Sequence, residues 1–246
     1  MQGMFWLAPH IFVCVKSNYF VVLDTKRDAT IVLDRGEFGS LAGFINGWPA
    51  SRSMETADRS GDVQPSPGVQ RLLEEMVSSD MLVRDERSGK AANPIRFAHP
   101  TLPLCDAYEA KRPILRVRDV SRFILAVCIA TLLLRRGSTQ ELIRRCQRRR
   151  DVIGLAINQH PLDVKRAREQ VRIFQRLAPL MTKRAREGTI ELFALWEFLT
   201  ARGIGTEIVF GVAVNPLSLH SWLQSDEFAL SGPPEATIAF TPILVM

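Results

Sequence analysis

The sequence predicts an α+β protein with two domains, and three observations carry that prediction. In residues 11–83, three short runs rich in β-branched and aromatic residues precede two helical patterns. In residues 189–245, a strongly apolar helical pattern precedes four strand patterns. The chain has 246 residues, 46% hydrophobic and 24% charged, which is ordinary for a globular protein and long enough for two domains. Each domain is therefore expected to pack helices against an antiparallel sheet.

The N-terminal strands are predicted at residues 11–17, 19–24 and 30–34. Ser17-Asn18 and Lys26-Arg27-Asp28 separate them, and residues of these types favour tight turns. A sheet of this kind leaves backbone N–H and C=O groups unpaired along its edge strands. An extended peptide can bind at such an edge as an added strand.

Two helices are predicted to follow these strands. The first runs from Phe38 to Ile45, and the second begins at Pro67, a residue favoured in the first helical turn. The polar, turn-rich residues 50–66 between them are expected to form a flexible loop, and residues 80–83 a short strand or turn. This order of elements predicts a small winged-helix-like module over residues 1–88.

Residues 89–115 are predicted to be a linker, because four prolines interrupt both helix and central strand. The next segment, Val120 to Leu134, is predicted to be a buried helix. Its apolar run of twelve residues is shorter than the about 20 that cross a bilayer. Further helices are expected at residues 141–150 and from Pro161 onward, with an apolar segment at residues 152–157.

The second domain, residues 116–246, ends in the most informative segment. Residues 189–202 form a helical pattern that is apolar on most sides, with large side chains at Leu192, Phe193, Leu195, Trp196, Phe198 and Leu199. Strands are predicted at residues 207–214, 219–225, 228–231 and 238–245. A buried helix on an antiparallel sheet is the expected architecture.

Charge and cysteine content restrict the possible partners. The net charge is +6, and arginines are concentrated in the middle helices, which indicates either solvated helix faces or an anionic partner. A DNA-binding winged-helix regulator is therefore retained as an alternative function.

The four cysteines lie far apart in the sequence and include no CxxC pair, so we expect neither a metal nor a cofactor. Cys14 and Cys128 lie in apolar runs and are expected in the core. Without a recognisable signal peptide, we expect a reducing cytoplasmic location.

The order of elements over residues 10–88 resembles the PqqD-like precursor-peptide recognition element of peptide-modifying enzymes. The resemblance implies that a leader peptide pairs with the third strand and packs beside the last helix. The implied peptide-binding residues are Thr30, Ile31, Val32, Leu72, Leu73 and Met76. The alternative is that these six side chains simply fill a core.

His220 alternates with Trp222 and Gln224 on one face of a predicted strand, where a lone histidine is more often a core residue than a catalyst. The segment from Gly211 to Trp222, which contains N-P-L-x-x-H-S-W, resembles the C-terminal domain of lasso-peptide biosynthesis B proteins. Those proteins are leader peptidases with a transglutaminase-like, papain-related fold. The family chemistry uses a cysteine thiolate at a helix N-terminus, a histidine that moves its proton, and an aspartate that orients the histidine.

This chain matches only one of those three positions, the histidine at His220. The nucleophile position falls on Gly188, and the acid position falls on Gly232 or its neighbour Ser231. Substitutes remain open: Thr189, Cys146 or Cys128 for the nucleophile, and Asp226 or Glu227 for the acid. Loss of a nucleophile typically costs on the order of a millionfold in turnover. The resemblance therefore implies a degenerate centre, a pseudoenzyme that binds a leader peptide.

The expected role is lasso-peptide maturation, a form of ribosomal peptide synthesis. The implied partners are the leader of a precursor peptide and an ATP-dependent cyclase resembling asparagine synthetase. A separate, catalytically active paralogue is compatible with this role. No membrane partner is expected, and nucleic acid is not favoured as a partner, because the basic residues lie mainly outside the winged-helix-like module.

Overall fold

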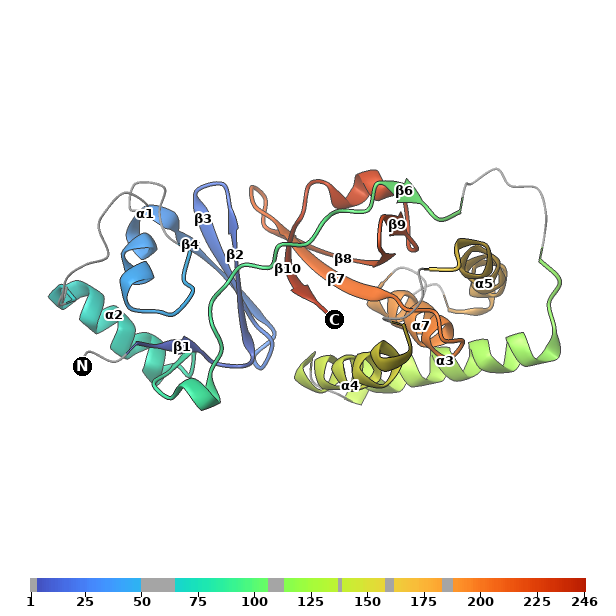
Figure 1. The fold of residues 1–246 in the computed structure, drawn as a ribbon, viewed down its shortest axis with the longest axis horizontal. Coiled ribbons are helices and arrows are strands. Elements are labelled where there is room, and N and C mark those ends of the chain that lie inside the picture. The colour runs from blue at the N-terminus through green and yellow to red at the C-terminus, as the bar shows by residue number, and fades with distance from the viewer. Residues whose placement is uncertain (1–3, 50–64, 106–112, 137–138, 158–161, 183–187) are drawn as a thin grey trace. The chain divides into compact units, whose positions relative to one another are not determined.

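The computed structural model divides the chain into two compact units, residues 1–96 (unit 1) and 97–246 (unit 2). It describes residues 4–49, 65–105, 113–136, 139–157, 162–182 and 188–246 (Figure 1). Most of the predicted loop at 50–66, part of the predicted linker, and Pro161, the predicted start of a helix, lie outside these ranges. Each unit is described by itself below.

Unit 1 is built on the predicted antiparallel meander. Strands β2 (Ile11–Lys16), β3 (Tyr19–Asp24) and β4 (Ala29–Asp34) pair in that order. The two connecting turns contain Ser17 and Asp28 at positive φ, 54° and 51°, a backbone conformation that polar turn residues tolerate better than bulky ones. The three predicted strands are confirmed to within one residue at each end.

Short helices and a second, small sheet complete unit 1. Helix α1 (Arg35–Phe38) and a 3-10 turn (Gly39–Gly43) follow β4, and α2 (Pro67–Ser78) precedes β5 (Leu82–Val83), which pairs with β1 (Trp6–Leu7). Ser66 caps α2 by accepting a hydrogen bond from the Val69 N–H. The unit consists mainly of strands, and its structure does not specifically show a winged helix.

The core of unit 1 lies between alternate residues of the meander and these helices. Ile11, Val13, Phe20 and Val22 from the sheet pack with Leu41 of the 3-10 turn and with Leu73 and Met76 of α2. Ile45, which the sequence predicts to end a helix, lies beyond the 3-10 turn and joins the same core. Lys90 pairs with Leu7 through backbone hydrogen bonds, and Ala92 belongs to the same core. The N-terminal part of the segment predicted as a linker, 89–115, therefore packs within unit 1.

Unit 2 contains a five-stranded sheet in the order β10-β7-β8-β9-β6. Strands β7 (Glu207–Ala213), β8 (Ser218–Ser225), β9 (Phe228–Ala229) and β10 (Thr241–Val245) are antiparallel neighbours and correspond to the four predicted strands. The fifth strand, β6 (Leu102–Pro103), pairs parallel with β9. Because β6 comes from the segment predicted as a linker, that segment is divided between the two units.

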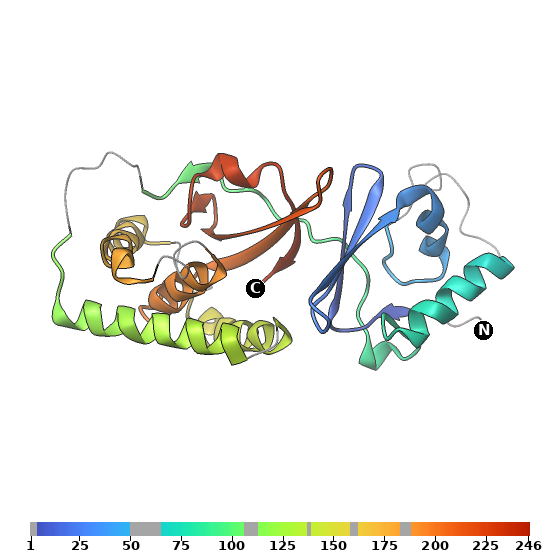
Figure 2. The ribbon, with the colours of Figure 1, turned by 180° about the vertical axis from the view of Figure 1, so that it is seen from behind.

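Helix α7 (Thr189–Thr200) forms the centre of unit 2, and its residues 192–200 are all buried, as predicted. It lies between α3 (Val117–Arg136) and the sheet, with α5 (Val164–Leu177) beside it (Figures 1 and 2). The segments predicted at 141–150 and 152–157 belong to one helix, α4 (Thr139–Ile157). Within the described ranges, no helix is both long enough and apolar enough to cross a membrane.

Two expectations about burial are wrong, and both concern α3. The helix buries Phe123, Ala126 and Ala130, whereas Ile124, Leu125 and Leu132 are more than half exposed. Cys128 was expected in the core but is exposed on the same outward side. The apolar sequence of α3 does not reveal which side faces α7, because apolar residues occur all around the helix. All four cysteines are free thiols, and Cys14 and Cys146 are buried.

Candidate functional site

His220 lies in the middle of β8, within a row of aromatic rings. Its imidazole centroid is 4.9 Å from the Phe240 ring and 6.0 Å from the Trp222 indole, which is nearly parallel to it. Trp222 is fully buried, whereas His220 is half-buried. The predicted alternation of His220, Trp222 and Gln224 along one strand face is therefore consistent with the ring contacts observed.

A second histidine, His99, also packs against Trp222. The His99 and Trp222 ring centroids are 5.9 Å apart, and the His99 Nδ1 lies 3.3 Å from the Thr237 hydroxyl oxygen. His99 was not predicted as a site residue, because its segment, within residues 89–115, was predicted to be a linker. The sequence shows only a histidine immediately before Pro100, which does not predict a site. The pairing of the following β6 with β9 joins segments far apart in the sequence.

Gly211 allows these rings to approach β7. It is the register partner of His220, and a Cβ atom at this position would lie 2.7 Å from the Trp222 ring and 2.8 Å from the Phe240 Cβ. Gln224 holds the opposite end of the indole, since the Trp222 Nε1–H donates to the Gln224 Oε1 at 2.7 Å. The Gln224 side-chain amide in turn donates to the Ala98 carbonyl oxygen at 3.0 Å. These contacts fix Trp222, the residue against which His220 packs.

The environment of His220 favours the neutral imidazole. Burial lowers the pKa of His220, because desolvation disfavours the charged ring. Among the described residues, none forms a hydrogen bond or an ion pair with that ring. A neutral imidazole can accept a proton, but no carboxylate here selects its tautomer or stabilises the imidazolium.

Gly188 is the N-cap residue of α7, the helix that packs against β8. Gly188 is exposed, its backbone is extended, and a Cβ atom added there would meet nothing within 4 Å. The position therefore has room for a side chain, although the residue present offers none. Thr189, the neighbouring candidate nucleophile, is exposed in the first turn of α7.

The cysteines considered as substitutes have different environments. Cys146 is buried in α4, where desolvation, the first cause, and the Glu197 carboxylate raise its pKa to about 12. A thiol with that pKa is almost entirely protonated at neutral pH and is a poor nucleophile. Cys128 lies on the outward side of α3.

The predicted acid position has no carboxylate either. Gly232 adopts a positive φ of 77°, which favours glycine over aspartate. Ser231 uses its hydroxyl oxygen to accept the Leu223 N–H at 2.7 Å. The turn between β8 and β9 is Asp226-Glu227, because Gln224 is the strand partner of Ala229 and Ser225 that of Phe228.

The candidate peptide-binding residues of unit 1 fall into two groups. Thr30, Ile31 and Val32 lie in β4, which pairs with β3 on one side; within the described ranges its other side has no strand partner. Ile31 is 37% exposed. On α2, Leu73 and Met76 are buried in the unit 1 core and Leu72 packs against it. The β4 residues are thus accessible, whereas Leu73 and Met76 have the core role named as the alternative.

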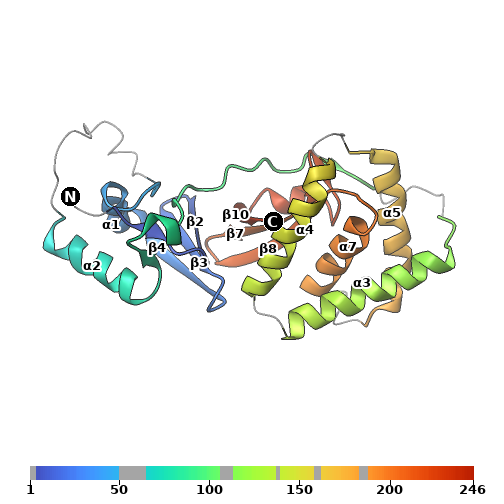
Figure 3. The same cartoon turned by 60° about the horizontal axis from the view of Figure 1, so that its bottom comes forward.

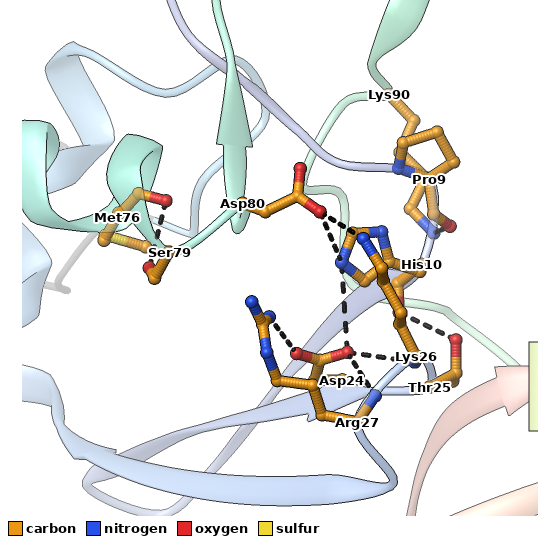
Figure 4. Close-up of polar contacts among 10 residues, drawn as sticks. All are labelled: Pro9, His10, Asp24, Thr25, Lys26, Arg27, Met76, Ser79, Asp80 and Lys90. Carbon is orange, nitrogen blue, oxygen red and sulfur yellow. Dashed lines mark hydrogen bonds and ion pairs between the residues drawn. The ribbon is translucent and has the colours of Figure 1, made fainter.

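A charged cluster connects α2 to the meander (Figure 4). His10, at the start of β2, is 6% exposed, and its Nε2 lies 3.9 Å from a carboxylate oxygen of Asp24 and 3.9 Å from one of Asp80. Arg27 pairs with Asp24 and Lys26 pairs with Asp80, each at 2.7 Å. Since Asp80 follows α2 and Asp24 ends β3, these ion pairs hold the end of α2 against the β3–β4 turn.

Several arginines of the middle helices make contacts within unit 2. Arg145 and Arg149 both pair with the buried Glu197 of α7, at 3.0 and 2.7 Å. Arg202 pairs with the buried Asp119 at 3.0 Å and lies 3.6 Å above the Phe198 ring. A group of three His, Cys, Asp or Glu side chains suitable for a metal ion does not occur within the described part of the chain. The arginine contacts favour a structural role for part of the basic composition.

A family model described as the transglutaminase-like superfamily matches residues 123–245, which are 123 of the 246 residues. The chain therefore belongs to the transglutaminase-like superfamily. The match runs from α3 to β10 and includes both Gly188 and His220. No curated protein and no solved structure matches the chain.

Proposed function

We propose that this protein acts in lasso-peptide maturation in the cytoplasm, as a B-type protein that binds the leader of a ribosomal precursor peptide without cleaving it. Unit 1 serves as the PqqD-like recognition element, and unit 2 is a transglutaminase-like leader-peptidase domain with a degenerate centre. Its partners are the leader peptide and an ATP-dependent cyclase that resembles asparagine synthetase. A separate, active paralogue performs the cleavage.

One observation carries this proposal: the N-cap position of α7 is an exposed glycine with open space around it, in a chain of the transglutaminase-like superfamily. A cysteine at a helix N-terminus is activated because the helix dipole and an adjacent base favour thiolate. Gly188 has no group to activate. His220 also has no carboxylate partner among the described residues.

Binding does not require that centre. The outer side of β4 offers backbone donors and acceptors for an added strand, as supported by its pairing with β3 alone among the described strands. The affinity would come from main-chain hydrogen bonds, and side chains such as Ile31 would provide selectivity.

The binding test uses the purified chain and the leader of the precursor encoded beside its gene. We expect saturable binding by fluorescence anisotropy and no leader release by mass spectrometry. Ile31→Asp should weaken binding by about tenfold or more, because a charge enters the peptide-facing strand. Leu180→Asp, at an exposed apolar residue of unit 2, is the matched control and should bind normally. Leader release that His220→Ala abolishes would refute the degenerate centre.

Gly188→Cys tests the geometry of that centre directly. The new thiol should react with iodoacetamide at lower pH than Cys128, because it lies at the N-terminus of α7. If His220 lies beside position 188, adding His220→Ala should raise the pH at which this thiol reacts. The readout is the pH dependence of alkylation at each cysteine, followed by mass spectrometry. An unchanged profile in the double variant would contradict the proposed arrangement of Gly188 and His220.

A further inference from the structure

Helix α3 has one side in the core of unit 2 and one apolar side that faces solvent. Phe123, Ala126 and Ala130 point inward, and α3 packs along α7 (Figure 3). On the outward side, Ile124, Leu125 and Leu132 are 53%, 59% and 53% exposed, and Cys128 is exposed between them. Three large apolar side chains on one helix face are more than the scattered exposure that needs no explanation.

The outward residues follow the spacing of a helix-packing seam. We call this row the α3 seam, and it is spaced three, four, three, four and three residues apart: Arg118, Ser121, Leu125, Cys128, Leu132 and Arg135. All six residues are exposed. Alternating spacings of three and four keep side chains on one narrow stripe, the stripe that packs along another helix at a shallow crossing angle. The occupant that fits the α3 seam is therefore a helix.

The charges at the ends of the seam restrict that helix further. Arg118 and Arg122 are exposed near the N-terminal end and Arg135 near the C-terminal end. Among the described residues of α3, Asp119 is the acidic one. It is buried and paired with Arg202, so it does not neutralise the exposed arginines of the seam. A second copy of the seam would bring arginines against arginines, whether the two helices ran parallel or antiparallel. A partner with acidic residues at both ends would be complementary.

We propose that the α3 seam is the docking site for an amphipathic helix of another protein, with apolar residues at spacings of three and four and acidic residues at both ends. This inference concerns unit 2 alone and does not depend on leader binding. A membrane surface is a different occupant of the same face, and the vesicle experiment below separates it from a helix.

The test uses two synthetic helical peptides with leucines at the seam spacing. One has glutamates at both ends, and its twin has lysines there. We expect the full chain to bind the glutamate peptide at least about tenfold more tightly, and salt to weaken that binding. Replacing Arg118, Arg122 and Arg135 together by glutamate should reverse the preference between the peptides. Equal affinity for both peptides, or an unchanged preference in the triple variant, would overturn the proposal.

Apolar packing is tested separately from charge. Leu125→Asp combined with Leu132→Asp should abolish binding of the glutamate peptide, and Leu180→Asp should leave it unchanged. Both positions are exposed, so the fold should be retained, and thermal unfolding checks this. Normal binding by the double variant would overturn the proposal.

Cys128 provides a local readout in the unmodified chain. Cys14 and Cys146 are buried, so an alkylating reagent should modify Cys128 faster than either of them. The glutamate peptide should slow modification of Cys128, and the lysine peptide should not. Protection of Cys128 by vesicles of equal phosphatidylglycerol and phosphatidylcholine, without protection by the glutamate peptide, would overturn the helix as occupant. Protection that rises with protein concentration alone would identify self-association and overturn it as well.

Discussion

At the residue scale, two positions define the chemistry available to unit 2. His220 is held among aromatic rings, and its burial favours the neutral imidazole. Gly188 leaves the N-terminus of α7 without a side chain. A cysteine peptidase forms its acyl intermediate through a thiolate. Gly188 offers no thiol at the position that the resemblance assigns to the nucleophile.

Gly211 should be far more sensitive to substitution than Gly188. Gly211→Ala would place a Cβ atom within 3 Å of Trp222 and Phe240, so we expect a loss of about 1–3 kcal/mol in the free energy of unfolding. Gly188→Ser is the matched control. It enters open space at a helix N-cap, where serine is favoured, and should change that free energy by no more than about 0.5 kcal/mol. Urea unfolding measures both, and equal effects would contradict the ring packing described here.

At the element scale, ion pairs join helices to their neighbours. Glu197 of α7 receives Arg145 and Arg149 from α4, while Arg202 connects the end of α7 to Asp119 of α3. Both members of the Arg202–Asp119 pair are buried, so removal of either one would leave a buried charge without compensation and destabilise the fold. In unit 1, the ion pairs around His10 join the end of α2 to the β3–β4 turn of the meander.

The pH dependence of the unit 1 cluster follows from Asp24. Burial alone would raise the pKa of Asp24, but hydrogen bonds from Arg27 and Lys26 outweigh it and hold that pKa below its usual value. A depressed pKa in the folded state contributes stability above the unfolded value of about 3.9, and that stability is lost as the pH falls through the folded pKa. Asp24→Asn should therefore be less stable than the unmodified chain at pH 7.

That difference in stability should shrink as the pH falls below about 4, because Asp24 then becomes protonated in the unfolded chain before it does so in the folded one. Denaturant unfolding between pH 3 and pH 7, followed by a probe in unit 1, measures the difference. Asp28→Asn, at an exposed residue of the same turn, is the control and should show little difference at any pH. A difference for Asp24→Asn that stays constant with pH would refute the assignment to Asp24.

At the scale of the whole molecule, each unit has its own sheet and its own buried core. We expect residues 1–96 and 97–246 to fold when expressed separately, which circular dichroism and cooperative thermal unfolding can check. Leader binding should remain with residues 1–96, and binding of the glutamate peptide should remain with residues 97–246. Leader affinity found in the 97–246 fragment would contradict the proposed division of roles.

Much of the architecture is predictable from local patterns. The three N-terminal strands, α2, α7 and the four C-terminal strands are recognisable because their periodicity and turn residues act over a few positions. His220 was also predictable as a site candidate, since its motif is continuous in the sequence, from Gly211 in β7 to Trp222 in β8. His99 was not, because its contact with Trp222 joins residues more than a hundred positions apart.

The sequence by itself determined the order of the elements, the apolar character of α7, and the absence of a side chain at Gly188, all of which are local properties of the chain. Only the tertiary structure decided which side of α3 faces solvent, that β6 extends the sheet, and that the arginines of α4 pair with α7. These features depend on which surfaces meet after folding. Contacts of that kind arise from packing between distant segments, which no local periodicity encodes.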